Sequence, residues 1–475
     1  PTDSEEYTQR SLKSNMATAP SKRIITIDIL RGITIFAMIL CANIGYYSDL
    51  PAWMFHGQTP PPTYEFNPDV PGITWVDLVF PFFLFTMGAA FPLAMRKRLE
   101  NGVSRWTVTG SLFRRWLTLT IFAIVLGNAY QIGSSTQPAV IKGFFNIVLW
   151  GVMFLSLVRV KDEKKTKLLN NVGMFIMIVM AVLATDWLGL TLSRWNSDVI
   201  IMILANVAIF GGLIWMFTKD NIRLRWLVLL FIIALKALSS YTPQVLAWVP
   251  SLGCIGWFFS WGYLQYLVIA VAGSIVGDML QSHSRSEVKT DIDGYHIAAG
   301  IIALAAMLVQ LWGLFTRHVL ADFIISAILG AAFVAITWKR RNILSSLGYF
   351  GFAFMLIGII FDPIDGGITK DHCNLAYMLT TTGMTALTGV FVLALELKWN
   401  IKGRGLSGCG QNPMLAYGVT NFFTGPILAM LGIGAWLDTI SLGSPFWGVV
   451  RGLVYTLLMV AVTCFFTKKK LFWRS

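Results

Sequence analysis

The residues with the clearest capacity for chemistry lie around a proline-rich loop, residues 50–62, with the sequence "LPAWMFHGQTPPP". His56 carries an imidazole that can serve as general base or nucleophile near neutral pH. The amphipathic Trp53 precedes it, and three prolines that restrict the backbone follow it. We predict that His56 is catalytic and that Trp53 contacts substrate. A histidine that merely lies at a membrane interface would fit the same pattern.

Two polar residues flank this loop in the sequence. Asn43 ends the preceding apolar run, where its amide could orient the imidazole or donate a hydrogen bond to a developing oxyanion. An interhelical hydrogen bond is the alternative. Asp77 opens the next apolar run and could also orient the imidazole, although the helix dipole alone favours a carboxylate there. We predict a catalytic group of His56, Asn43 and Asp77.

Further ionisable residues occur in two other segments. Asp28 and Arg31 are three residues apart on one face of the first apolar run, as a structural pair or as part of an anion site. The segment 361–374, "FDPIDGGITKDHCN", concentrates charges that could contact a polar acceptor, although a solvated loop would look similar. Its candidate substrate-binding residues are Asp362, Asp365, Lys370 and Asp371.

The segment 403–418, "GRGLSGCGQNPMLAYG", contains a formal GxGxxG pattern. No strand precedes it, so it does not match a dinucleotide-binding fingerprint. Glycine amides beside Lys402 and Arg404 could hold a phosphate, and an ordinary flexible loop is the alternative. The five histidines and five cysteines are dispersed without CxxC or CxxH spacing, which favours neither a metal site nor a disulfide framework.

The composition predicts an all-α, polytopic integral membrane helical bundle. Of the 475 residues 56% are hydrophobic and 13% are charged, whereas soluble proteins have about 25% charged residues. Backbone groups in lipid must be satisfied within helices, and we expect about 11–14 transmembrane helices. The apolar segments are 24–45, 73–95, 113–131, 141–158, 169–186, 197–217, 225–241, 254–278, 295–314, 320–337, 345–361, 374–396, 411–432 and 446–466.

The net charge of +13 comes from short basic clusters between these segments, which is a topology signal rather than a nucleic-acid-binding pattern. With a cytoplasmic N-terminus, most of the 37 Lys and Arg residues face the cytoplasm and His56 lies on the outer side. An even number of helices then puts both termini inside. Residues 1–21 form a polar tail, of which the stretch before Met16 is set aside as vector-derived or a misplaced start. Residues 22–475 form one domain.

Three motifs together carry a resemblance to a known family. "TIDILRGITIFAMILCAN", "PAWMFHGQTPPP" and "GITWVDLVFPFFLFTMGAA" resemble the heparan-α-glucosaminide N-acetyltransferase family of transmembrane acyltransferases, and most closely its bacterial branch. The family pattern falls on Asp28, Arg31, Gly32, Asn43, His56 and the segment 77–88. The resemblance covers residues 22–100, with scattered support over 345–425. The chain departs from the pattern by an insertion after His56, "TPPPTYEFNPDVP", and by lacking an evident Arg-x-x-Gly-Val-Leu-Gln-Arg segment.

The resemblance implies transfer of an acetyl group from cytoplasmic acetyl-CoA to an amino sugar or glycan on the outer face. His56 would be the catalytic base or the acetyl carrier. It also implies a bacterial inner-membrane location, and the dispersed histidines and cysteines predict no metal. The residues assigned to acetyl-CoA binding are Asp28, Arg31, Arg96, Lys97, Arg98, Arg114, Arg115 and Arg404, with the basic ones attracting its phosphates.

A transporter or flippase of a sugar or lipid-linked intermediate is the alternative function, with Lys236 as its mid-membrane candidate. The expected partners of the chain are the lipid bilayer, acetyl-CoA and the acceptor, with no nucleic acid. A homodimer stays open as an assembly, because no heptad or GxxxG seam argues for it or against it.

Overall fold

The computed structural model describes residues 25–45, 50–134, 137–160, 162–188, 196–242, 253–285, 294–340 and 342–473. Within them the chain is almost entirely helical, which confirms the predicted all-α class. The strands β1 (Val158–Arg159) and β2 (Phe472–Trp473) pair antiparallel. The long helices are α2 (Thr26–Asn43), α3 (Val79–Glu100), α4 (Arg105–Ser134), α5 (Ala139–Leu157), α6 (Glu163–Leu188), α7 (Val199–Thr218), α8 (Ile222–Tyr241), α11 (Leu267–Arg285), α12 (Gly294–Phe315), α13 (Val319–Thr337), α14 (Ile343–Ile364), α15 (Leu375–Trp399) and α20 (Pro445–Lys468).

Shorter elements complete the fold. They are the 3-10 turns η1 (Ala52–Met54) and η2 (Trp75–Leu78), the helices α9 (Cys254–Phe258), α10 (Trp261–Leu264), α16 (Arg404–Gln411), α17 (Pro413–Val419), α18 (Gly425–Met430) and α19 (Ile433–Ser441), and the π-helical segment η6 (Thr420–Thr424).

The chain has the helices of an integral membrane protein. In the described part, 10 helices are long and apolar enough to cross a membrane, or up to 12 if each of two bent pairs is one span. All the predicted apolar segments coincide with helices, α6 and α8 included. The prediction of one helix over 254–278 was wrong, because α9, α10 and α11 divide this segment and the two arms of the pair meet at 66°. A second bend, of 91°, follows the predicted segment 411–432 and separates α18 from α19. At the second bend Gly432 adopts a φ of 71°, which ends α18.

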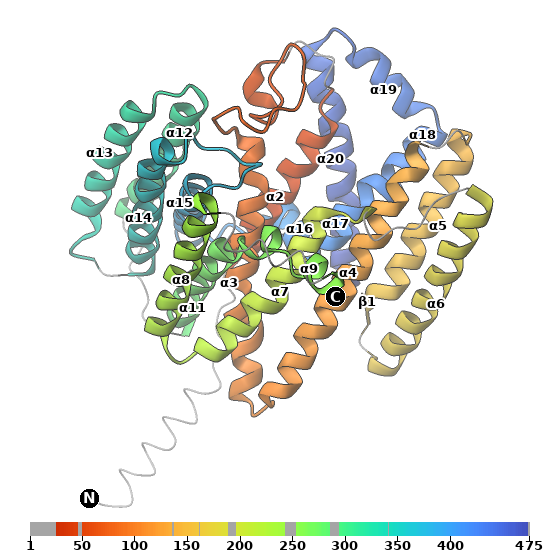
Figure 1. The fold of residues 1–475 in the computed structure, drawn as a ribbon, viewed down its shortest axis with the longest axis horizontal. Helices are drawn as coiled ribbons and strands as arrows, with labels where there is room; N and C mark the ends of the chain where they lie inside the picture. Colours follow the sequence, from red (N-terminus) through yellow and green to blue (C-terminus); the bar gives the residue numbers. More distant parts are fainter. Residues whose placement is uncertain are drawn as a thin grey trace, which may run out of the picture.

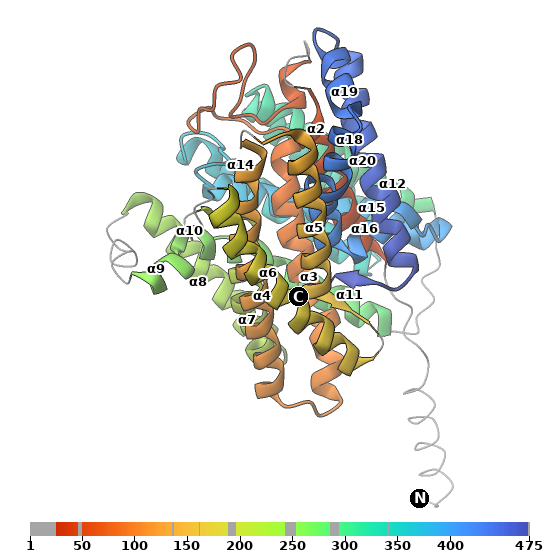
Figure 2. The ribbon, with the colours of Figure 1, turned by 90° about the vertical axis from the view of Figure 1, so that its right-hand side faces the viewer.

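Successive long helices run antiparallel, so their connections gather at two ends of the bundle (Figures 1 and 2). We call the end with the loop of residues 50–74 the histidine end, and the end with the α3–α4 turn, residues 101–104, the basic end. In Figure 1 the histidine end is at the top. The turns after α5 and α7 and the end of α20 also lie at the basic end. The Lys- and Arg-rich segments therefore share one end, and its exposure to the cytoplasm stays a prediction.

Close backbone contact fixes α2 at the centre of the bundle. A Cβ atom on Gly32 would lie 1.9 Å from the carbonyl oxygen of Leu406 in α16, and one on Gly410 would lie 1.9 Å from that of Asp28. Only glycine allows backbones to approach so closely. This crossing holds α2 in a single rotation, so one helix face carries Arg31 near the basic end and cavity-lining residues near the histidine end.

Candidate active site

The loop that carries His56 is held by its own side chains rather than left in solvent. Phe55 packs edge-to-face on Tyr64, with their ring centroids 5.0 Å apart. Gln58 is fully buried and donates hydrogen bonds to the carbonyl oxygens of Val70 (3.0 Å) and Gly72 (3.1 Å). These hydrogen bonds of a buried side-chain amide hold the start of the loop, at Gln58, against its end, at residues 70–72. These contacts therefore hold the backbone that carries the imidazole of His56 in place.

The carboxylate of Asp77 forms a hydrogen bond with the imidazole of His56. Its carboxylate is fully buried, and Oδ1 lies 2.7 Å from Nδ1 of His56. Oδ2 accepts hydrogen bonds from the backbone amides of Thr74 (2.9 Å) and Gly57 (3.1 Å). One carboxylate thus completes the capping box that starts η2 and fixes the histidine. The prediction that Asp77 could orient His56 agrees with this geometry.

Lys370 is the third member of this group. Its Nζ lies 3.0 Å from Nδ1 of His56 and 3.8 Å from Oδ1 of Asp77. Nδ1 can carry only one hydrogen, and the shorter contact favours an Nδ1–H that donates to Asp77 rather than an Nδ1 that accepts from Lys370. The other ring nitrogen, Nε2, is then left with its lone pair. This arrangement gives His56 the tautomer that a base or nucleophile needs.

The α14–α15 loop brings Lys370 to the site through a clamp of ion pairs and hydrogen bonds. Arg317 binds Asp362 with both terminal nitrogens, at 2.9 and 2.8 Å, and Asp362 is 2% exposed. Asp362 Oδ1 also accepts from the amide of Ile368 (2.7 Å), whose carbonyl accepts from the amide of Gly72 (2.8 Å). The two loops therefore form one unit around His56.

The other carboxylates proposed for substrate binding do not meet at the histidine. Asp362 is occupied by Arg317, and Asp365 accepts from the amide of Ala376 (2.8 Å) at the start of α15. Asp371 is exposed on the same loop, and Trp53 is 51% exposed on η1. Lys370 alone of this set touches the site. The charged residues of segment 361–374 share one loop because they are close in sequence. Their side-chain partners determine that Lys370, and not Asp362 or Asp365, lies against His56.

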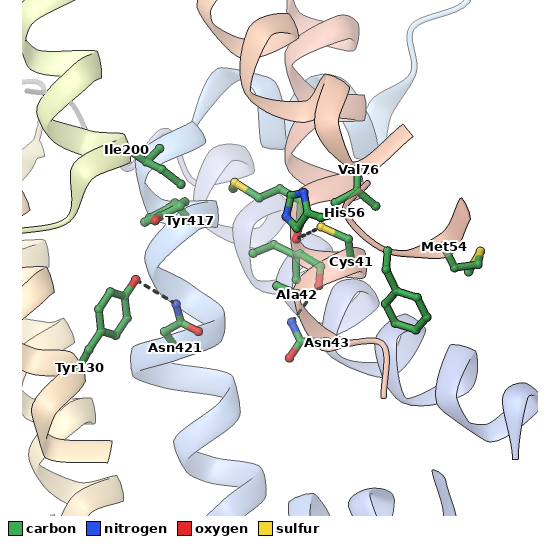
Figure 3. A pocket seen from close by; sticks show the side chains of 13 residues that line it. Cys41, Ala42, Asn43, Met54, His56, Val76, Tyr130, Ile200, Tyr417 and Asn421 are labelled. Atoms are coloured by element: carbon green, nitrogen blue, oxygen red, sulfur yellow. Dashed lines mark hydrogen bonds between the residues drawn. The ribbon is translucent and has the colours of Figure 1, made fainter. Parts of the chain in front are cut away.

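A cavity of about 300 Å³ lies beside His56. Figure 3 shows it between α2 and the histidine loop on one side and α4, α17 and η6 on the other. The polar or reactive residues that line it are Cys41, Asn43, His56, Tyr130, Tyr417 and Asn421. Four of these were missed by sequence reasoning, because Cys41, Tyr130, Tyr417 and Asn421 lie in apolar segments with no recognisable spacing. The cavity gives the imidazole room to act on a small bound group.

Asn43 lines this cavity without touching the imidazole. Its Nδ2 donates to the carbonyl oxygen of Ile39 (2.8 Å), one turn back on α2. The orienting role considered for Asn43 therefore falls to Asp77. The second N–H of the amide stays available at the cavity wall, where it could stabilise an oxyanion.

One other group near the site bears on its chemistry, the thiol of Cys373. Burial raises the pKa of the Cys373 thiol to about 11, so the thiol is protonated at neutral pH and is a poor nucleophile. Within the described residues, no three His, Cys, Asp or Glu side chains come together to hold a metal ion.

A second cluster of interest lies below the cavity, toward the basic end. Arg31 donates to the carbonyl oxygens of Gly410 (3.0 Å) and Thr86 (3.1 Å) and lies 3.9 Å from Asp28. Arg115 from α4 is close enough for its charge to be repelled by that of Arg31, and its Nε is buried without a hydrogen-bond partner. Two guanidinium groups therefore come from α2 and α4 to this part of the bundle. Such a pair is suited to an anion.

The remaining residues assigned to acetyl-CoA phosphates are not gathered there. Arg96 binds Asp278 (2.8 Å), which also pairs with the fully buried Arg225, so Arg96 is part of a structural network. The other four side chains are exposed: Lys97, Arg98, Arg114 and Arg404. The structure thus does not bring the whole group together, and the half-buried Arg31 and Arg115 come from two segments far apart in the chain.

Comparison with known proteins adds two findings. Human heparan-alpha-glucosaminide N-acetyltransferase is 30% identical over 112 residues, which is 23% of this chain and 15% of that enzyme. The aligned stretch thus covers well under two thirds of the enzyme, and the similarity indicates a distant relation. The family profile described as "Domain of unknown function (DUF5009)" matches residues 23–280. Because this match covers more than half of the chain, the protein belongs to the DUF5009 family.

Proposed function

We propose that this protein is a membrane-embedded acyltransferase that moves an acetyl group from acetyl-CoA to the amine of an amino sugar. The observation that carries the proposal is the pair of His56 and Asp77 at 2.7 Å, with Nε2 of His56 free beside a cavity. A base positioned by a buried carboxylate is the arrangement used to activate a nucleophile. The distant similarity to an N-acetyltransferase supports the same reaction class.

The proposed acetyl transfer uses the side chains of His56 and Asn43 together with the donor and the acceptor. The acceptor amine attacks the thioester carbonyl, His56 Nε2 takes the proton from the amine, and the C–S bond breaks as the proton passes to the leaving thiolate. In the alternative route Nε2 itself attacks the carbonyl and carries the acetyl group to the amine. In either route the second N–H of the Asn43 amide would donate to the developing oxyanion.

The donor would enter from the basic end. Arg31, Met38 and Ala42 lie on one face of α2, and Met38 and Ala42 line the cavity. On α4, Arg115 and Tyr130 are separated by about four helical turns, compared with about three between Arg31 and Ala42 on α2. The path from Arg31 to Cys41 is about 15 Å along α2, a span that suits a slender pantetheine arm. Phosphates held by Arg31 and the unpartnered Nε of Arg115 would place the thioester near His56.

This path also assigns the sides of the membrane. Acetyl-CoA is a cytoplasmic metabolite, so the basic end would face the cytoplasm and the histidine end the outside. The concentration of Lys and Arg at the basic end supports this orientation independently.

The test uses purified protein in nanodiscs with radiolabelled acetyl-CoA and D-glucosamine. We expect acetylated sugar with the wild type and a loss of at least about 10³-fold with His56→Ala. His372→Ala is the matched control, because His372 also pairs with an aspartate, Asp69 (2.8 Å), at the same end but outside the cavity. Equal activity of His56→Ala and wild type would refute the proposal. A protein mass raised by one acetyl group would select the acetyl-histidine route.

A transporter is the second candidate, because two helix pairs are broken and Lys236 lies at one break. Lys236 is 6% exposed, and its Nζ donates to Gln265 (2.7 Å) between α10 and α11. Broken helices with a buried charge are frequent in transporters. The test is uptake of labelled amino sugar into proteoliposomes in the absence of acetyl-CoA. Uptake that Lys236→Met abolishes and His56→Ala leaves unchanged would favour this function.

A further inference from the structure

The wall of the cavity opposite His56 is polar and is built from three elements. Tyr130 comes from α4, Tyr417 from α17 and Asn421 from η6 (Figure 3). Asp198, at the start of α7, lies behind them and accepts hydrogen bonds at Oδ2 from Tyr417 (2.9 Å) and Tyr130 (3.4 Å). The chemistry proposed for His56 makes no use of these four residues.

The direction of the hydrogen bonds decides what this wall can bind. A phenol has one hydrogen to donate, and both phenols give theirs to Asp198. Asn421 directs its Nδ2 to the oxygen of Tyr130 (3.5 Å), which leaves its carbonyl oxygen to accept. The polar groups free to meet a ligand are therefore mainly acceptors, namely two phenol oxygens and an amide oxygen, beside the second N–H of Asn421. A ligand that fits must bring several hydrogen-bond donors.

The wall also offers an aromatic face. Tyr130 is 43% exposed, and its ring stacks on Phe422 with centroids 6.2 Å apart. Asn421 and Phe422 both belong to the π-helical segment η6, an irregularity that occurs most often at functional sites. The extra residue in the turn brings Asn421 to the cavity while Phe422 stays buried against the bundle.

We propose that this wall is the binding site for the acceptor, and that it selects a hydroxyl-bearing amine, such as a pyranose amino sugar, over an apolar amine. The assignment rests on the proposed acyl transfer at His56. The sugar ring lies against Tyr130, and its hydroxyl hydrogens are accepted by Tyr417 and Asn421. Asp198 is a positioning residue, because it holds both phenols as acceptors without itself reaching the ligand.

The first measurement is equilibrium binding in nanodiscs without any donor, by saturation-transfer NMR. D-glucosamine is compared with cyclohexylamine, an amine of the same ring size that lacks hydroxyls. Tyr417→Phe removes one acceptor and should weaken glucosamine binding about tenfold while leaving cyclohexylamine binding within twofold. Tyr241→Phe is the matched control, since Tyr241 also donates to a carboxylate, Asp365 (3.5 Å), outside the cavity.

Asp198→Asn tests the positioning role. An asparagine keeps the hydrogen bond that starts α7, to the amide of Ile201 (3.0 Å), but faces the phenols with an NH₂ group. We expect a similar loss of glucosamine binding with an unchanged melting temperature. Adding Tyr417→Phe should cost little more, because Asp198 acts through Tyr417.

Two outcomes would overturn the assignment: equal losses for both amines, or no saturable glucosamine binding by the wild type. Consumption of acetyl-CoA is measured separately. A wild type that binds glucosamine through Tyr417 but leaves acetyl-CoA intact would refute the proposed transfer while the assignment of the wall stands.

Discussion

Replacing Asp77 by asparagine separates its two roles, in capping η2 and in orienting His56. Oδ2 accepts hydrogen bonds from the backbone amides of Thr74 (2.9 Å) and Gly57 (3.1 Å). Oδ1 accepts from Nδ1 of His56 (2.7 Å). Asparagine has one oxygen, and the two buried amides will claim it because an unpaired buried amide costs about 1–3 kcal/mol each. The NH₂ group of the variant then faces His56.

The consequence for the imidazole is a change of tautomer. An NH₂ donor beside Nδ1 makes that nitrogen an acceptor, so the hydrogen moves to Nε2 and the lone pair at the cavity is lost. Where a buried carboxylate orients a catalytic histidine, this substitution lowers kcat by about 10⁴-fold, and we expect a loss of about 10³ to 10⁴ here. The fold should survive, since the cap is kept.

The assay is acetyl transfer to D-glucosamine at saturating donor, together with the melting temperature of each variant in detergent. Asp365→Asn is the matched control, because Asp365 also receives a backbone amide (2.8 Å) at a helix start but lies outside the cavity lining. Activity of Asp77→Asn within tenfold of wild type, at equal stability, would refute the tautomer argument. A melting temperature that falls in step with activity would show that Asp77 serves the fold alone.

Three further predictions address other parts of the molecule. Arg115→Gln should weaken acetyl-CoA binding about tenfold in a titration, because it removes a charge-assisted contact, whereas the exposed neighbour change Arg114→Gln should have less than a twofold effect; equal effects would argue against a buried phosphate site. Gly32→Ala should destabilise the protein by about 1–3 kcal/mol in chemical unfolding, since its Cβ would meet a backbone oxygen at 1.9 Å. Gly405→Ala, whose Cβ finds its nearest neighbour at 3.7 Å, should be nearly neutral, and a reversal of this order would contradict the packing argument. Cys373, with a pKa raised to about 11, should resist maleimide at pH 8 in the folded protein and react after unfolding; rapid labelling of the native thiol would show that it is accessible and ionised.

The fold was predictable to a large extent because a membrane imposes strong local rules. Apolar length located every long helix, α6 and α8 included, but not the short helix α19. The bends at α10–α11 and in the 413–441 region were not predictable. The second of them follows Gly432, whose φ of 71° is a local backbone conformation that apolar length does not record.

For the site, the sequence by itself determined that His56 and Asp77 flank one loop at the start of a helix, since their separation is short and the prolines limit the chain. Tertiary structure alone decided that Lys370 joins them, that Asp362 does not, and that Tyr417 and Asp198 form the opposite wall. Residues hundreds of positions apart meet only when helix rotation is fixed by close packing, as at Gly32. The direction of each hydrogen bond, and with it the chemistry of the cavity, is set by that packing rather than by any local motif.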